Sequence, residues 1–305
     1  MMNRIWAPSV GIAALAMASA AGAADAGPKV RHGYTDSQYG ELHYAIAKPV
    51  GGGTQKTPLV MFHQTANSSV EFGNLVPEMG KDRVTIAIDT PGYGGSDGPD
   101  KIPTIEDYAV AMATGLKALG YGPDKPVDVL GYHTGAFTAG ELAIVHAKMI
   151  RRVVLVGEWI VPEERRLKAI ANLPRYETSV AFFDWLAASL PRYKESALVK
   201  AIGDANWGRV FVDSLRPLTR REHGHDAAFE YAVRVRDRLP KIEQPVLLVA
   251  IDDGIREPTL EAKKFIKNGE LADLPHLKGD AFFNHAPELG GVLRKFLDSV
   301  KTAQK

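Results

Sequence analysis

The chain contains no cysteine among its 305 residues. This absence excludes disulfide bonds, thiolate nucleophiles and cysteine-ligated zinc or iron–sulfur centres. An excess of charge of either sign is also missing, because 37 Lys and Arg residues stand against 36 Asp and Glu residues. Such a balance disfavours nucleic acid and anionic membranes as the main partner. We therefore expect a small-molecule ligand and no nucleic-acid partner, while the oligomeric state stays open.

Long apolar runs are scarce, and the most apolar one lies near the N-terminus. Arg4 precedes an apolar stretch over residues 10–18, and small residues follow it up to Ala23. This order is typical of a secretory signal peptide, and the stretch is about half of the roughly 20 residues that a spanning helix needs. We expect residues 1–23 to be removed, with no membrane insertion of the mature protein. We expect the mature protein to be periplasmic or secreted, and the lack of disulfides favours the periplasm.

Short apolar runs alternate with segments of helical periodicity along the rest of the chain. A predicted hairpin over 31–35 and 41–48 comes first, and five predicted strands follow at 58–62, 84–88, 127–130, 153–156 and 246–251. Helices are predicted over 105–119, 136–149 and 259–266, and a closing helix over about 287–300. This alternation predicts an α/β fold with a mostly parallel sheet. Strands that are apolar throughout indicate that helices cover both faces of the sheet.

One long segment interrupts the alternation. Residues 162–239 contain charged helical stretches at 163–171 and 226–238 but no strand-like run. We interpret residues 161–240 as a helical lid inserted between the two parts of a core, 24–160 and 241–305. The aromatic residues in or beside it include Trp159, Trp185 and Trp207. They either bury the lid against the core or line an apolar pocket above the site.

Three sequence motifs follow predicted strands. They are His63-Gln64-Thr65, the run Asp89-Thr90-Pro91-Gly92-Tyr93-Gly94-Gly95-Ser96, and Gly131-Tyr132-His133-Thr134-Gly135. In their order and spacing the motifs resemble the α/β-hydrolase superfamily, and in particular its lidded branch of haloalkane dehalogenases, epoxide hydrolases and C–C bond hydrolases. The resemblance covers nearly all of the mature chain. It implies an α/β-hydrolase fold and hydrolytic activity.

The catalytic positions depart from the pattern of that family. The family places Ser, Asp or Cys at the centre of the sharp turn, the nucleophile elbow, where this chain has His133. The usual place of the catalytic His is taken by Asp280, and the next histidine, His285, lies further along. The acid position is filled by Asp253, and Glu158 matches a second acid position of some dehalogenases. A conventional serine-based triad is therefore not expected.

An imidazole at the elbow is suited to acid–base chemistry. The N-terminus of the following helix disfavours the imidazolium, whereas a neighbouring carboxylate of Asp253 or Asp280 favours it. A neutral histidine held by a carboxylate is a competent base near neutral pH, so we expect His133 to activate water or to remove a substrate proton. Direct attack by the imidazole is a less favoured alternative. The backbone N–H groups of Thr65 and Thr134 are the expected oxyanion donors.

Further residues are assigned to the substrate site. Gln64 replaces the usual Gly of the family and adds a side-chain amide beside the oxyanion donors. Trp159 is placed in contact with the substrate, and His63 either braces its loop or takes part in the reaction. Glu158 is either a second acid or a solvated residue at the lid entrance. The His223-Gly224-His225-Asp226 run lacks the partners of a zinc site, so we expect neither metal nor cofactor.

Three functions remain open. The first is an exported hydrolase that acts on a small, apolar or aromatic ester, lactone or related bond, with His133 as the base. The second is a cofactor-free lyase or isomerase in which His133 abstracts a substrate proton. The third is a non-catalytic small-molecule binder that has lost its nucleophile and kept the fold.

Overall fold

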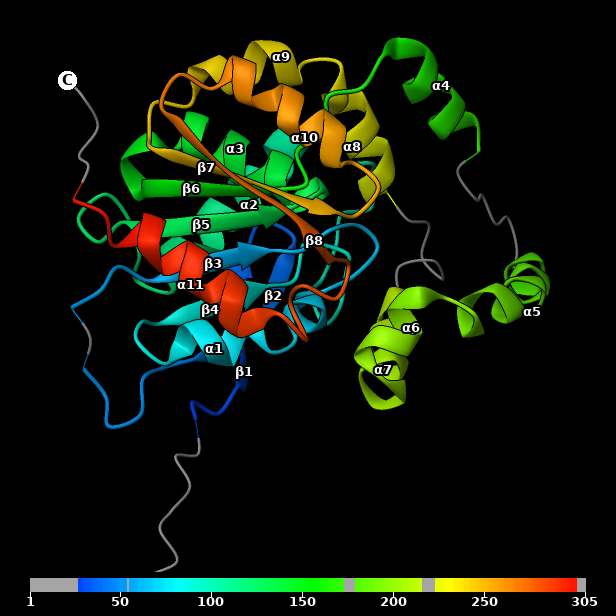
Figure 1. The fold of residues 1–305 in the computed structure, drawn as a ribbon, viewed down its shortest axis with the longest axis horizontal. Helices are drawn as coiled ribbons and strands as arrows, with labels where there is room; N and C mark the ends of the chain where they lie inside the picture. Colours follow the sequence, from blue (N-terminus) through cyan, green and yellow to red (C-terminus); the bar gives the residue numbers. More distant parts are fainter. Residues whose placement is uncertain (1–26, 54, 173–178, 216–222, 301–305) are drawn as a thin grey trace, which may run out of the picture.

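An eight-stranded sheet forms the centre of the molecule (Figure 1). The computed structural model describes residues 27–53, 55–172, 179–215 and 223–300. The strand order is β1-β2-β4-β3-β5-β6-β7-β8, and β2 pairs antiparallel with β1 and with β4, whereas the other pairings are parallel. The strands are Arg31–Ser37, Gly40–Ala47, Leu59–Phe62, Thr85–Ile88, Val127–Tyr132, Ile150–Val156, Val246–Asp252 and Gly269–Lys278. The predicted α/β class and mostly parallel sheet are confirmed.

The last strand, β8, was not predicted. It pairs with β7 at the edge of the sheet, and its side chains are mostly exposed or half-buried. Pro275 and several charged residues interrupt the apolar pattern that marks the other parallel strands. Proline is tolerated at a sheet edge, where one side of the strand makes no ladder hydrogen bonds. Strand β8 therefore carries no continuous apolar signal.

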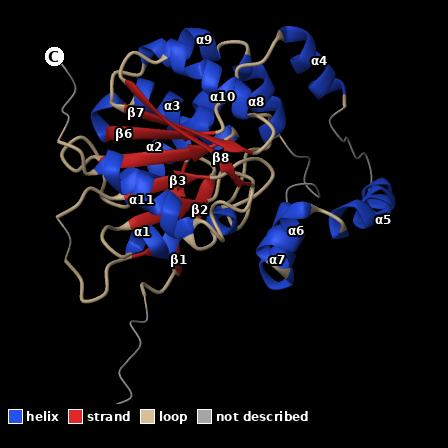
Figure 2. Ribbon diagram, in the orientation of Figure 1, coloured by secondary structure: helices blue, strands red, loops and turns tan. Residues whose placement is uncertain are grey.

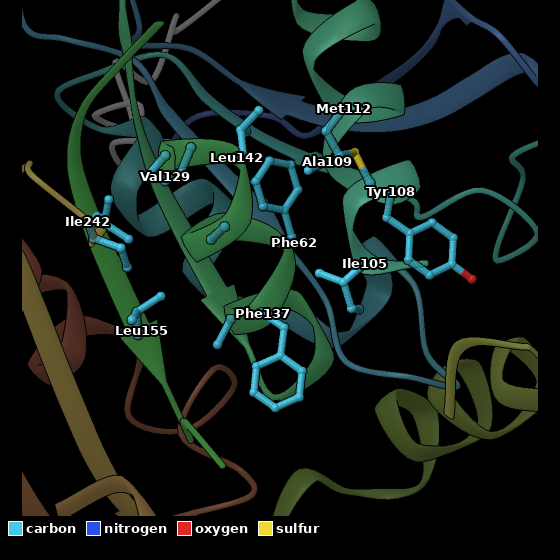
Figure 3. Packing of buried hydrophobic residues seen from close by; sticks show 14 of the residues in the cluster. Phe62, Ile105, Tyr108, Ala109, Met112, Val129, Phe137, Leu142, Leu155 and Ile242 are labelled. Carbon is cyan, nitrogen blue, oxygen red and sulfur yellow. The ribbon is translucent and has the colours of Figure 1, made fainter. Parts of the chain in front are cut away.

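Helices cover both faces of the sheet (Figure 2). One face is covered by α2 (Ile105–Ala118) and α3 (Thr134–Val145), and the other by α1 (Leu75–Gly80) and α11 (Ala286–Leu297). Figure 3 shows part of the core on the side of α2 and α3, a single cluster to which Phe62 and Val129 of the sheet and Met112 and Phe137 of the helices belong. Strands that are buried on both sides are apolar at most positions, which explains their short apolar runs. Asp128 of β5, an exception, is paired with Arg151 of β6.

The segment between β6 and β7 contains only helices among its described residues. They are α4 (Glu163–Ala171), α5 (Ser179–Lys194), α6 (Ala197–Ile202), α7 (Asp204–Leu215), α8 (Gly224–Ala232), α9 (Val235–Arg238) and the short 3₁₀ helix η4 (Leu239–Lys241). The first four lie on the side toward which β5 and β6 point (Figure 1). Helices α8 and α9 pack on α3, and there Glu141 accepts hydrogen bonds from Tyr231 and Arg238. The segment is thus helical, as the sequence predicts.

The predicted signal peptide cannot be compared with the structure. Residues 1–23, which carry the predicted signal peptide, belong to a stretch that lies outside the described residues. In the described part of the chain, no helix combines the length and the apolar character that crossing a bilayer requires.

Candidate active site

A sharp turn between β5 and α3 carries His133. Of the described residues, His133 is the only non-glycine with a positive φ, at φ 50° and ψ −112°. Glycines on both sides allow the close packing of the turn. A Cβ at Gly131 would lie 2.0 Å from the carbonyl oxygen of Gly135, and one at Gly135 would lie 2.0 Å from that of Phe62. A strained residue held this tightly is typical of functional sites.

Asp253 holds the imidazole of His133. Its Oδ2 lies 2.9 Å from Nε2 of His133, and its side chain is 2% exposed. The other oxygen, Oδ1, accepts a hydrogen bond from the backbone N–H of Ile255 at 3.1 Å. Because a carboxylate only accepts, Nε2 carries a proton, and in the neutral ring Nδ1 then keeps its lone pair. Within the described part of the chain Nδ1 has no hydrogen-bond partner, so it is the ring atom available as a base.

Gly157, at the end of β6, makes room for this pair. Its φ is +66°, a conformation that favours glycine. A Cβ at this position would lie 2.4 Å from Cδ2 of His133 and 2.9 Å from Oδ2 of Asp253. The ends of β5, β6 and β7 therefore assemble the His133–Asp253 pair at the carboxyl edge of the sheet, where ligands bind in open α/β folds.

A pocket of about 200 Å³ opens beside His133. Thr65 and Thr134 also line it, and among the described residues neither backbone N–H has an acceptor. An oxyanion site needs free donors of this kind, and the assignment of these two N–H groups to it stays a prediction. The remaining wall is largely apolar and aromatic, and it includes Trp159 and residues of α8: Phe137, Trp159, Ala228, Phe229 and Ile255. His225 adds a second imidazole to the lining.

The side-chain amide of Gln64 points to a buried carboxylate. Glu71 accepts hydrogen bonds from the backbone N–H of Gln64 at 3.0 Å, from the Gln64 side-chain amide, and from Nδ2 of Asn67 at 2.6 Å. Burial raises the pKa of Glu71 to about 7, although these hydrogen bonds act in the opposite direction. Glu71 was not predicted from the sequence, because a single Glu in a short 3₁₀ helix belongs to no recognisable motif.

His63 is buried next to the same loop. Its Nδ1 lies 2.7 Å from the carbonyl oxygen of Gln64, and its Nε2 accepts a hydrogen bond from the backbone N–H of Thr90 at 2.8 Å. Burial lowers the pKa of His63, which favours the neutral ring that this hydrogen-bond pattern requires. Both ring nitrogens are engaged, an arrangement that fits a residue bracing the loop.

The structure does not bring Asp280 to His133. Asp280 lies in the turn between β8 and α11, and its carboxylate accepts a hydrogen bond from Nδ2 of Asn284 at 2.8 Å. Nε2 of His285 is 3.9 Å from the same carboxylate. In the described residues, no hydrogen bond or ion pair joins Asp280 or His285 to His133. Asp253 is therefore the acid that orients the imidazole in this structure.

Glu158 is buried rather than solvated. It is 1% exposed and faces a small cavity between α3 and α8, where Phe137 and Tyr231 also lie. Its Oε2 has no hydrogen-bond partner among the described residues. Burial raises its pKa to about 8, so the carboxyl is mostly neutral at pH 7. The structure thus places Glu158 behind Phe137, outside the pocket of His133.

Glu158 makes the stability of the fold depend on pH. Its pKa is about 8 when folded and ordinarily 4.5, so the folded chain keeps a proton that the unfolded chain loses between these pH values. Folding stability is therefore expected to fall as pH rises from about 4.5 to 8, by up to about 1.4 kcal/mol per pH unit from this group. Glu158→Gln should flatten the decline in urea unfolding measured at pH 5 and pH 8.5. Substitution of the exposed Glu164 by Gln should leave the decline in stability unchanged. An unchanged decline in E158Q would show that Glu158 does not cause it.

Comparisons with known proteins agree with this geometry. The family model of the alpha/beta hydrolase fold matches residues 57–275, more than half of the chain. A pimeloyl-[acyl-carrier protein] methyl ester esterase from Neisseria meningitidis serogroup C is 26% identical over 247 residues, 75% of this chain and 89% of that protein. A 2-hydroxymuconate semialdehyde hydrolase from a Pseudomonas species is 35% identical over 104 residues, 33% of this chain and 36% of that protein.

Solved structures show the same fold. An enol-lactonase from Burkholderia xenovorans superposes with a TM-score of 0.64 at 20% identity, covering 88% of this chain and 100% of that chain. An esterase from a Rhodococcus species superposes with a TM-score of 0.69 at 21% identity, covering 89% and 99%. The sheet, the elbow and the family match lead to one conclusion: the chain belongs to the α/β-hydrolase family of enzymes.

Proposed function

We propose that the protein is an exported hydrolase of small esters or lactones in which His133 activates water. The observation that carries the proposal is the His133–Asp253 pair, with Nε2 bound to the carboxylate and Nδ1 left as a base beside the pocket. Serine, the family's usual nucleophile, is absent from the elbow. A base that deprotonates water is the chemistry that this pair supports without a side-chain nucleophile.

The proposed reaction uses the two free backbone donors. Nδ1 of His133 takes a proton from water while the water oxygen attacks the carbonyl carbon of the substrate. The negative charge that develops on the carbonyl oxygen is stabilised by the N–H groups of Thr65 and Thr134. Collapse of the tetrahedral intermediate breaks the bond to the leaving oxygen. The imidazolium of His133 returns its proton to that oxygen and becomes neutral again.

The size and lining of the pocket support a small, apolar or aromatic substrate. Its volume of about 200 Å³ lies below the usual range for drug-sized ligands, about 300–1,000 Å³. Trp159 and Phe229 present aromatic surface, and charged side chains other than histidine are absent from its described lining. The names of the relatives, an esterase and an enol-lactonase, support the ester or lactone class. Export rests on the sequence of residues 1–23 alone.

The proposal is tested by assaying the mature protein on a panel of small aryl and alkyl esters and lactones in ¹⁸O-labelled water. We expect turnover of at least one class, with one solvent oxygen in the acid product and no covalent adduct in intact-protein mass spectra. An adduct on His133 would instead show direct attack by the imidazole. Turnover of a carbonyl substrate without ¹⁸O uptake would show a lyase or isomerase. Stabilisation by these compounds without any turnover would show a binding protein.

A further inference from the structure

Glu71 is joined to the loop that carries one of the oxyanion donors. It lies on the 3₁₀ helix η1 (Ser69–Phe72), is 6% exposed, and faces the loop of residues 64–67. Among the described residues its carboxylate accepts three hydrogen bonds, and all come from this loop, two from Gln64 and one from Asn67. A buried carboxylate is costly to desolvate and is retained where several donors satisfy it.

The bonds are distributed over both carboxylate oxygens. Oε2 accepts from the backbone N–H of Gln64, and Oε1 accepts from the side-chain amides of Gln64 and Asn67. The first bond holds the peptide between His63 and Gln64, and the other two hold the side chains of Gln64 and Asn67. The next peptide carries both the carbonyl of Gln64 and the N–H of Thr65. Its carbonyl accepts from Nδ1 of His63 at 2.7 Å and from the backbone N–H of Asn67 at 3.0 Å, so Glu71 holds the residues on either side of that peptide.

We propose that Glu71 is a positioning residue that holds the N–H of Thr65 toward the substrate oxyanion. The inference rests on the proposed hydrolase function and adds to it a residue outside the pocket lining. Glu71 acts through the loop rather than on the substrate, because its carboxylate is occupied by Gln64 and Asn67. The oxyanion forms only in the transition state, so a misplaced donor is expected to lower kcat more than it changes KM.

Glu71→Gln separates this function from simple filling of space. A carboxamide has one accepting oxygen and one donating NH₂ group in place of two accepting oxygens. In one orientation its NH₂ group faces the backbone N–H of Gln64, which can only donate. In the other it faces the side-chain amides of Gln64 and Asn67, which must turn over to accept from it. The volume is unchanged, while the hydrogen-bond pattern that holds the loop has to change. Asn67→Ala is a milder variant, because it removes one of the three donors and leaves the carboxylate in place.

The test uses p-nitrophenyl acetate at pH 8.5, where Glu71 with its pKa of about 7 is ionised. We expect kcat of E71Q to fall about 10- to 100-fold with KM changed less than threefold, and kcat of N67A to fall less. Hydrogen exchange of the 64–67 peptide should become faster in E71Q. The matched control is E78Q: in the described part of the chain the carboxylate of Glu78 binds Lys81, just after α1, and Arg294 on α11, and it makes no hydrogen bond to the loop. It should change neither readout.

The outcomes separate the two claims. An unchanged kcat in E71Q, or a rise in KM that accounts for the whole loss, would overturn the proposal for Glu71 while the hydrolase function stands. A wild-type protein that turns over no ester or lactone would instead overturn the hydrolase function. In that case exchange alone decides whether Glu71 holds the loop: faster exchange in E71Q but not in E78Q supports it, and equal exchange overturns it. If E71Q does not fold, N67A tests the proposal by kcat and by hydrogen exchange of the 64–67 peptide.

Discussion

Replacing His133 by glycine is expected to lower the hydrolysis of p-nitrophenyl acetate by about 10²–10⁴-fold, the usual contribution of a general base. The side chain that pairs with Asp253 and borders the pocket is then missing, while the two oxyanion donors remain. Glycine suits this position, because φ is +50° and a residue without Cβ adopts that conformation readily. Relief of the positive φ should therefore offset part of the stability that is lost with the hydrogen bond to the buried Asp253.

The control for His133 is a histidine outside the pocket. His276 on β8 is exposed and pairs with Glu288 at 2.6 Å. His276→Ala is expected to keep wild-type turnover. If H133G retained more than half of the wild-type kcat with the same KM, His133 would have no catalytic function in this reaction.

Asp253→Asn is expected to have an effect of similar size, about 10³–10⁴-fold on kcat, although it changes only an oxygen to an NH₂ group. The backbone N–H of Ile255 donates to Oδ1, so the amide oxygen of the asparagine must take that place. Its NH₂ group then faces Nε2 of His133 and donates to it. The proton of the ring moves to Nδ1, and the atom that should receive a proton from water no longer has a lone pair.

The neighbouring residue provides a matched control for this change. Asp252 precedes Asp253 in the chain, but unlike Asp253 it has a largely exposed side chain. Its Oδ2 lies 4.0 Å from Nζ of Lys278. Asp252→Asn should leave kcat and KM near the wild-type values. A D253N enzyme with more than a tenth of the wild-type kcat would show that the tautomer of His133 does not control the reaction. Both variants are compared by steady-state kinetics at several pH values, with the melting temperature as the measure of folding.

The elements that carry strong local signals were predictable. Strands β3 to β7 are buried on both faces, so their sequences are short apolar runs that alternate with helices. The elbow was found from Gly131 and Gly135, whose missing side chains allow the turn to pack. Strand β8 was missed, because an edge strand with exposed residues carries no comparable run.

The site could be predicted only where the backbone fixes it. Asp253 directly follows β7, and the ends of neighbouring parallel strands meet at one edge, so its approach to His133 follows from topology. Asp280 lies in a turn after β8, where Asn284 determines the direction of its carboxylate, and spacing along the chain does not reveal that contact. Glu71 reaches the site through three hydrogen bonds from the folded loop, and these have no counterpart in the sequence.

Chemical rescue of H133G by imidazole tests the catalytic function of His133 most directly. Free imidazole has the same ring as the missing side chain, and glycine leaves the space that the ring occupied. We expect imidazole to restore hydrolysis in a saturable manner, at a rate above that of imidazole with the ester alone. The product acid should carry one ¹⁸O from labelled water, and the protein should carry no adduct. A rate that never exceeds the reaction of free imidazole, while the wild-type enzyme is active, would contradict water activation at His133.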